Sequence, residues 1–147
     1  MYKHILIPTD GSETATKAVE AGIQFAREAD AKITWFTALP EYQLPTQAEV
    51  MSHHSVTPDE HALRCRDKAE GIFAEPTRLA RAAGVDFDTE HVQSDYPYQA
   101  IIDAAKRHGC DLIFMASHGR RGISALVHGS ETREVLTHST IPTLVYR

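Results

Sequence analysis

Short apolar segments alternate with longer helical patterns along the chain, and this alternation restricts the fold more than any other feature. β-Branched and aromatic residues predict strands at residues 4–8, 32–38, 85–93, 111–116 and 143–146. Helices are predicted between them, after Ser12 and at about residues 58–83, 97–108 and 130–138. Strands that alternate with helices are typical of a parallel sheet, because parallel neighbours need a long crossover. We therefore expect an α/β fold, an open five-stranded parallel sheet with helices on both faces.

Two of the predicted helices carry informative residues. After Ser12, a favourable N-cap, small and apolar side chains recur every three or four positions, as one buried helix face requires. These side chains belong to Ala15, Ala18, Val19, Gly22, Ile23 and Ala26. Pro76 predicts a kink or a break in the 58–83 helix, because proline has no backbone N–H to donate. Residues 39–57 show no period and predict a long irregular connection.

The composition fits one domain that spans residues 1–147. With 42% hydrophobic and 24% charged residues, the chain can bury a core without a disulfide or a metal. Its net charge of −5 disfavours a nonspecific nucleic-acid binder. Cys65 and Cys110 form no CxxC pair, which favours two reduced thiols. No stretch resembles a signal peptide or a membrane span, so we expect a cytoplasmic protein that does not insert into a membrane.

Polar, glycine-bearing turns follow the first and the fourth predicted strands. One is Pro8-Thr9-Asp10-Gly11-Ser12, and the other is the run from Ala116 to Gly122. In an open parallel sheet, ligands bind beyond the carboxyl ends of the strands, where the strand order reverses. If strands one and four are neighbours, both turns line one crevice. The second turn leads to Gly129-Ser130-Glu131-Thr132, where the start of the last helix offers backbone N–H groups to an anion.

Standard nucleotide motifs do not occur in the chain. We find neither GxxxxGK[ST] nor a GxGxxG that follows a predicted strand. A P-loop NTPase and a dinucleotide dehydrogenase are therefore disfavoured. Without the P-loop lysine, the charge that builds on a transferring phosphoryl group lacks a strong cation to neutralise it. We accordingly expect phosphoryl transfer to be slow or absent.

The nine histidines indicate neither a metal centre nor a hydrolase. His61 and Cys65 are four residues apart, which places them on one face of a helix, but a zinc site needs further ligands. Ser117 and His118 are adjacent in the sequence, but a serine nucleophile and its base usually come together through the fold and need an orienting carboxylate. Adjacency alone therefore does not indicate a serine hydrolase. We therefore predict no catalytic and no metal-binding residue.

Three segments together resemble the universal stress protein family. They are the run from Ile5 to Ser12, the run from Asp111 to Gly119 followed by Gly129-Ser130, and the ending from Ile141 to Val145. The nucleotide-binding branch of that family carries Gly-x2-Gly-x9-Gly-[Ser/Thr], and this chain matches its last three elements. Ala116 replaces the first glycine. Alanine costs little there at a negative φ, but about 1 kcal/mol or more at a positive φ.

The resemblance implies a Rossmann-like fold similar to the adenine-nucleotide α-hydrolases, with strand order 3-2-1-4-5, and it implies that the chain binds ATP with Mg²⁺. It places Pro8, Thr9 and Asp10 beside the adenosine, with Asp10 near the ribose or a metal-phosphate group. It places Ala38 and Met115 by the adenine. The residues it assigns to the phosphates and to the segment around them are Ala116, His118, Gly119, Arg120, Arg121, Gly129, Ser130, Glu131 and Thr132.

The resemblance also implies a regulatory protein of the stress response. Such a protein signals through nucleotide-dependent oligomerisation or through a protein partner, which in some members of the family is a transporter. A homodimer would form through the last predicted strand, whose apolar edge at residues 143–146 needs a partner, and nucleotide-bound tetramers are a further option. Two alternatives stay open: a slow ATPase or nucleotide hydrolase, and a nucleotide-free interaction module, which Ala116 favours.

Overall fold

The five predicted strands form one parallel sheet. The computed structural model describes residues 1–117 and 131–147. The strands lie in the order β3-β2-β1-β4-β5, and every neighbouring pair is parallel. They are β1 (His4–Pro8), β2 (Lys32–Leu39), β3 (Phe87–Gln93), β4 (Leu112–Ala116) and β5 (Thr143–Tyr146). The α/β class and the strand order are therefore confirmed, and the predicted strand ends differ from these by no more than two residues.

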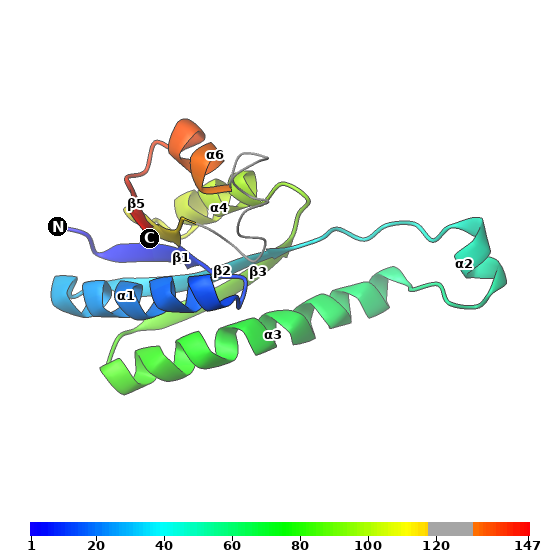
Figure 1. Ribbon diagram of the computed structural model, residues 1–147, viewed down its shortest axis with the longest axis horizontal. Coiled ribbons are helices and arrows are strands. Elements are labelled where there is room, and N and C mark those ends of the chain that lie inside the picture. Colours follow the sequence, from blue (N-terminus) through cyan, green and yellow to red (C-terminus); the bar gives the residue numbers. More distant parts are fainter. Residues whose placement is uncertain (118–130) are drawn as a thin grey trace.

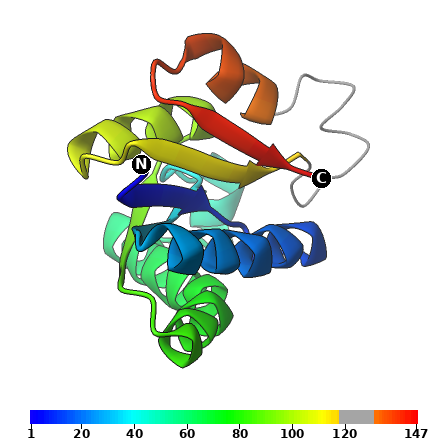
Figure 2. The same cartoon turned by 90° about the vertical axis from the view of Figure 1, so that its left-hand side faces the viewer.

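Helices cover both faces of the sheet. The described helices are α1 (Glu13–Ala29), α2 (Gln47–Met51), α3 (Pro58–Ala83), α4 (Pro97–Arg107) and α6 (Glu131–His138). Figure 1 and Figure 2 show α1 and α3 on one face and α4 and α6 on the other. Alternate side chains of each strand enter one of two cores. Ile5 and Ile7 of β1 join the core with α1 and α3, whereas Leu6 joins the core with α4 and α6.

Helix α1 follows the predicted pattern closely. The hydroxyl of Ser12 accepts the N–H of Ala15 at 3.2 Å, as expected of an N-cap. The buried residues of α1 are the six predicted ones, Ala15, Ala18, Val19, Gly22, Ile23 and Ala26. A Cβ on Gly22 would lie 2.5 Å from Cδ1 of Ile7. The absence of a side chain at this position therefore lets α1 lie close to β1 and fixes the position of the turn between them.

Of the two outcomes predicted at Pro76, a kink or a break, the break does not occur, because α3 continues from Pro58 to Ala83. Pro76 is buried, in one stripe with Phe73 and Ala80 on the side that packs on the sheet. A proline inside a helix costs about 3 kcal/mol of local stability. Burial of this stripe offsets that cost, so tertiary packing maintains a helix that local propensity alone would interrupt.

Residues 40–57, which we call the arm, contain a helix that the sequence analysis missed. Helix α2 begins with a capping box: the hydroxyl of Thr46 accepts the N–H of Glu49 at 3.2 Å, and the Glu49 carboxylate accepts the N–H of Thr46 at 2.7 Å. The expectation of a wholly irregular connection is therefore wrong for Gln47–Met51. Figure 1 shows the arm extending away from the sheet, with α2 at its far end.

A membrane span has no candidate among the described residues. Neither the helices of residues 1–117 nor α6 combine the length and the apolar composition that crossing a bilayer requires.

Asp111 joins the amino ends of β1 and β4. Its carboxylate accepts the backbone N–H of Lys3 at 2.9 Å and that of His4 at 3.1 Å. Burial raises the pKa of Asp111, but hydrogen bonds from backbone N–H groups, including these two, outweigh burial. The net pKa of Asp111 therefore lies below its ordinary value. Next to this contact, Nε2 of His4 lies 2.7 Å from the hydroxyl of Thr34 on β2. Burial and then the charge of Lys32 lower the pKa of His4.

The lowered pKa of His4 predicts acid sensitivity. Above pH 6.5, the ordinary pKa of histidine, His4 is neutral in both the folded and the unfolded chain and contributes no pH dependence. Below it, the unfolded chain binds a proton that folded His4 resists, so the free energy of unfolding falls until the pH reaches the lowered pKa. Urea unfolding followed through Trp35, the one tryptophan of the chain, measures this fall. We expect a smaller fall in His4→Gln, and an equal fall in both proteins would contradict the assignment.

Candidate functional site

The strand order reverses beside β1, and this point brings the two predicted turns together. β1 pairs with β2 on one side and with β4 on the other, in the register Ile5 to Leu112 and Leu6 to Ile113. Because all strands are parallel, the turn after β1 and the chain that leaves β4 lie at the same edge of the sheet. This arrangement is the switch point at which open α/β sheets bind ligands. The condition that strands one and four are neighbours is therefore met.

The turn after β1 has a fixed conformation. The N–H of Thr9 donates to the carbonyl of Phe36 at 2.9 Å, which holds the turn against β2. The hydroxyl of Thr9, a buried residue, accepts the N–H of Gly11 at 3.3 Å, and Oδ1 of Asp10 accepts the N–H of Ser12 at 2.9 Å. Gly11 has a φ of 78°, which a residue without Cβ adopts at no steric cost. The Asp10 carboxylate is thus held at the carboxyl edge by the start of α1.

Two residues predicted to contact adenine share one face of the sheet. Met115 is only 5% exposed and packs in the core with Leu6 and Phe36, and Ala38 packs against the same core. Ala116 lies on the other face, where it packs against the core with α1 and α3. Within the described residues, Met115 therefore packs in the core and leaves little surface for a ligand to contact.

Ala116 is the last residue of β4 and pairs with Tyr146 of β5. Its extended conformation is not a positive φ, which among described residues other than glycine occurs at Asp30 and His53. The sequence left open whether this residue has a negative or a positive φ, and the structure has the conformation in which alanine costs little. Replacing the first glycine of the motif by alanine introduces no backbone strain at this position.

The start of α6 is anchored at the same edge. The hydroxyl of Thr132, a buried residue, donates to the carbonyl of Ala116 at 2.8 Å. This hydrogen bond ties the first turn of α6 to the end of β4. Ala116 and Thr132 therefore lie next to each other at this edge of the sheet. The sequence marked Thr132 as part of the site, but it contained no signal for this tether.

Glu131 caps a neighbouring helix. Its Oε2 accepts the N–H of Tyr98 at 2.7 Å. The N-cap of α4 is Tyr96, whose side chain makes no capping hydrogen bond, so Glu131 from α6 supplies the acceptor instead. Burial raises the pKa of Glu131, the Tyr98 N–H lowers it and Glu134 raises it, with a net pKa above its ordinary value. A tyrosine at a helix N-cap is the sequence signal that could have indicated a capping group from elsewhere.

Six of the predicted site residues lie outside the described residues. They are His118, Gly119, Arg120, Arg121, Gly129 and Ser130. The remaining ones, Pro8, Thr9, Asp10, Ala38, Met115, Ala116, Glu131 and Thr132, belong to the ends of β1, β2 and β4, the turn after β1 and the start of α6.

The structure also tests the grouping of His61 with Cys65. His61 and Cys65 do lie on one helix face, with Nε2 of His61 3.5 Å from the Cys65 sulfur, but this ring nitrogen also lies 2.8 Å from the Pro40 carbonyl. Within residues 1–117 and 131–147, no three His, Cys, Asp or Glu side chains are placed to hold a metal ion.

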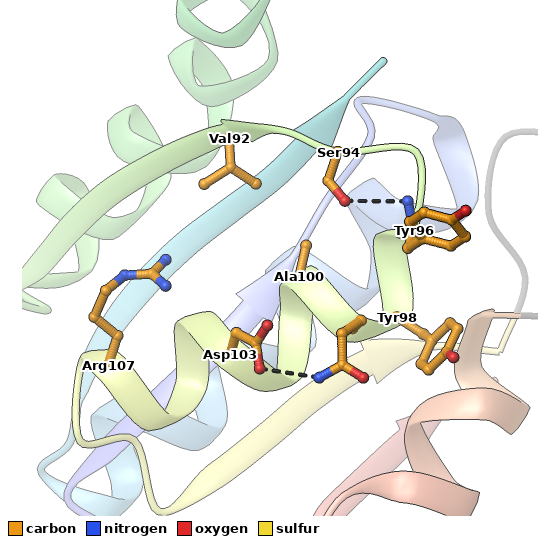
Figure 3. A pocket seen from close by; sticks show the side chains of 8 residues that line it. Val92, Ser94, Tyr96, Tyr98, Ala100, Asp103 and Arg107 are labelled. Carbon is orange, nitrogen blue, oxygen red and sulfur yellow. Dashed lines mark hydrogen bonds between the residues drawn. The ribbon is translucent and has the colours of Figure 1, made fainter. Parts of the chain in front are cut away.

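A groove of about 430 Å³ lies between β3 and α4, and residues such as Val92, Tyr96, Tyr98 and Arg107 line it (Figure 3). Of the predicted nucleotide-binding residues that the structure describes, none lines this groove. Several of its polar groups are already paired: Ser94 accepts the N–H of Tyr96 at 3.1 Å, and the Gln99 amide donates to Asp103 at 2.9 Å. We therefore assign no ligand to it.

Comparison with known proteins decides the family. The model of the universal stress protein family matches residues 1–147. The chain belongs to the universal stress protein family. Universal stress protein YxiE of Bacillus subtilis is 28% identical over 153 residues, which cover 100% of this chain and 100% of that relative.

Solved structures of universal stress proteins share the fold. The structure of MJ0577, a universal stress protein of Methanocaldococcus jannaschii, matches with a TM-score of 0.79 at 26% identity and covers 99% of this chain and 95% of that chain. A universal stress protein in complex with cAMP matches with a TM-score of 0.73 at 24% identity and covers 99% of this chain and 97% of that chain. The open parallel sheet with its reversal at β1 is thus the universal stress protein fold.

The cap between α6 and α4 predicts a measurable effect of Glu131. Glu131→Ala leaves the N–H of Tyr98 without this acceptor, so we expect a loss of about 1 kcal/mol in the free energy of unfolding. Glu131→Gln keeps an amide oxygen as acceptor and should lose less. Urea unfolding gives the free energies, and hydrogen exchange of the Tyr98 amide reports the cap itself. Glu20→Ala, an exposed change on α1, is the control. Unchanged exchange at Tyr98 in Glu131→Ala would refute the cap.

Proposed function

We propose that this universal stress protein binds ATP, together with Mg²⁺, at the carboxyl edge of the sheet between β1 and β4. ATP occupancy then regulates its association with a partner protein. One observation carries the proposal: the turn after β1 lies beside the end of β4, and the hydrogen bond from Thr132 to Ala116 brings the start of α6 to the same place.

The proposed phosphate site rests on the positions of the two elements that flank the glycine motif, the end of β4 and the start of α6. Gly119, Gly129 and Ser130 fall between the end of β4 and the start of α6. Both of these ends lie at the switch point, because Thr132 is bonded to Ala116. α6 begins at this place, and the first turn of a helix offers backbone N–H groups and the positive end of the helix dipole, which favour an anion. Arg120 and Arg121 would add charged donors to an otherwise acidic chain.

The adenosine part rests on the ends of β1 and β2. Pro8, Thr9 and Ala38 lie at the carboxyl ends of these strands, on the same edge as Asp10. The Asp10 carboxylate is of the type that accepts a ribose hydroxyl or holds Mg²⁺ through oxygen. The fold neighbour that was solved with cAMP shows that a protein of this architecture accepts an adenine nucleotide. The absence of a positive φ at Ala116 supports nucleotide binding over a nucleotide-free module, because alanine adds no backbone strain there.

The partner part rests on the sheet edge at β5. In the described sheet β5 pairs with β4 alone, so its other edge is open, and Tyr146 at its end is 37% exposed. An open edge strand is a site for pairing with another chain. We propose a homodimer through β5 in the cytoplasm, in which nucleotide binding controls tetramer formation or the binding of a regulated protein such as a membrane transporter.

A slow ATPase or nucleotide hydrolase would use the same site. The two functions differ in turnover, because a binding protein needs no group that neutralises charge in the transition state. Phosphate release from purified protein with Mg²⁺ and ATP distinguishes them. Sustained release above about one per second would make the protein an enzyme rather than a nucleotide-binding regulator.

The phosphate site predicts the effect of Gly129→Val. A branched side chain at residue 129 would occupy the space that a phosphate oxygen must enter, so we expect nucleotide retention to be lost. Purified protein is denatured by heat, released adenine nucleotide is identified by chromatography, and binding of added ATP is measured by calorimetry. Gly71→Val is the matched control, because a Cβ at this position on α3 would meet no described side chain or backbone within 4 Å beyond its own turn of the helix.

The wild type and Gly71→Val should release or bind ATP, whereas Gly129→Val should do neither and should keep the unfolding midpoint of the wild type. Retention of ATP by folded Gly129→Val would overturn the phosphate contact. A wild type that carries no nucleotide and binds none would overturn the proposed function as a whole.

A further inference from the structure

The first turn of α6 joins two elements that are distant from each other in the sequence. Its first residue, Glu131, accepts through Oε2 the N–H of Tyr98 at the start of α4, at 2.7 Å. Its second residue, Thr132, donates its hydroxyl to the carbonyl of Ala116 at the end of β4, at 2.8 Å. Two adjacent residues thus reach in two directions, one to a neighbouring helix and one to the edge of the sheet. A movement of this turn acts on both contacts.

The start of α4 depends on the contact with Glu131. α4 begins with Pro97, which has no N–H, and the side chain of its N-cap Tyr96 makes no capping hydrogen bond. Tyr98 therefore carries the first backbone N–H inside the helix, and a helix leaves such a donor without an intrahelical partner. A carboxylate at this position also meets the positive end of the helix dipole. Glu131 supplies both the acceptor and the negative charge from 33 positions further along the chain.

Beyond this first turn, α4 and α6 pack on each other. Val135 of α6 is fully buried in the same core as Ile101 and Ile102 of α4. The ring of Tyr98 stacks on the ring of His138 in the last turn of α6, with the ring centroids 5.4 Å apart. Densely packed side chains have low compressibility and transmit a displacement to their neighbours. A shift at the start of α6 therefore reaches the start of α4.

The start of α4 is also part of the molecular surface. Tyr96 and Tyr98 line the groove between β3 and α4, and Tyr96 is 68% exposed (Figure 3). The N–H of Tyr96 donates to the Ser94 hydroxyl at 3.1 Å, and that of Tyr98 donates to Glu131, so two side-chain acceptors set the path of the chain into α4. The contact from Glu131 therefore links the carboxyl edge of the sheet to an exposed aromatic surface.

We propose that Glu131 couples nucleotide binding to the start of α4, a regulatory device that rests on the proposed function. A phosphate group bound beside the first turn of α6 holds this turn against β4, and this position of the turn stabilises the cap from Glu131 to Tyr98. By linkage, the closed cap favours nucleotide binding to the same degree. Glu131 is thus a positioning residue, whose side chain serves α4 rather than the phosphates. The empty and the occupied protein differ at the surface around Tyr96, where a partner protein can distinguish them.

Hydrogen exchange of the Tyr98 amide, measured by NMR on the full chain with and without ATP and Mg²⁺, tests the coupling. In the wild type, saturating ATP should slow this exchange roughly fivefold or more, which is the lower end of typical couplings between two sites. The amide of Glu49 is the internal reference, because it is also capped by a side chain, Thr46, and α2 lies far from α6 (Figure 1). ATP should leave its exchange unchanged. In Glu131→Ala, ATP should no longer slow the exchange of Tyr98.

Calorimetric titration with ATP separates the cap from the charge of Glu131. Glu131→Ala removes the acceptor and should raise the dissociation constant of ATP roughly fivefold, by reciprocity of the coupling. Glu131→Gln keeps an amide oxygen as acceptor and should stay closer to the wild type. Glu134→Gln is the matched control, because it removes the same charge one turn further along α6, where Glu134 pairs with His138 rather than with α4. It should bind ATP like the wild type.

The outcomes separate this coupling from the function on which it rests. A wild type that binds ATP but shows the same exchange of Tyr98 with and without ATP would overturn the coupling alone. So would an ATP effect on Tyr98 that persists in Glu131→Ala, which is the result expected of a purely structural cap. Tighter ATP binding by both Glu131 variants would show that the carboxylate acts by repelling phosphate, and this also overturns the coupling. A wild type that binds no ATP would overturn both the nucleotide site and the coupling.

Discussion

The pairing of β1 with β4 is the contact on which the architecture depends. Up to β3 the chain builds the sheet outward from β1 in one direction, and after α4 it must return to the free side of β1. Asp111 secures this return: its N–H donates to the carbonyl of His4 at 2.9 Å, and its carboxylate accepts the N–H groups of Lys3 and His4. A short strand thereby gains a fixed register against a partner more than a hundred residues away. The reversal of strand order, and with it the position of the candidate site, follows from this contact.

The two edges of the sheet are built differently. At the amino edge, polar groups such as Asp111, His4 and Thr34 satisfy one another, so this edge contributes to stability and to its dependence on pH. At the carboxyl edge, the hydrogen bonds of Thr9, Asp10 and Thr132 fix turns and helix starts around the end of β4. Rigid elements that hold turns at one place are the usual basis of a binding site in this class of fold. The arm extends from the same part of the molecule, since β2 leads from Ala38 directly into it.

Local patterns were sufficient to predict the strands and most helices. The buried face of α1 was read correctly because its six residues repeat at helical spacing, and β4 because its apolar run is bounded by polar residues. Helix α2 was missed because five residues are too few to show a period, although Thr46 and Glu49 carry the capping-box signature. A kink or a break at Pro76 was expected from local propensity alone, and α3 continues through Pro76 because packing on the sheet outweighs the local cost. The cap from Glu131 to Tyr98 joins residues 33 positions apart, which no local pattern reports.

The central claim, that ATP binds at the reversal of the sheet beside β1 and β4, is tested most directly by amide chemical shifts. Two-dimensional NMR spectra of the full chain are compared with and without ATP and Mg²⁺. The account predicts that the amides of Thr9, Asp10 and Gly11, and those at Ser117 and Thr132, shift on binding, whereas Lys3, His4 and Asp111 at the amino edge do not. Shifts confined to the amino edge, or to the groove between β3 and α4, would contradict it.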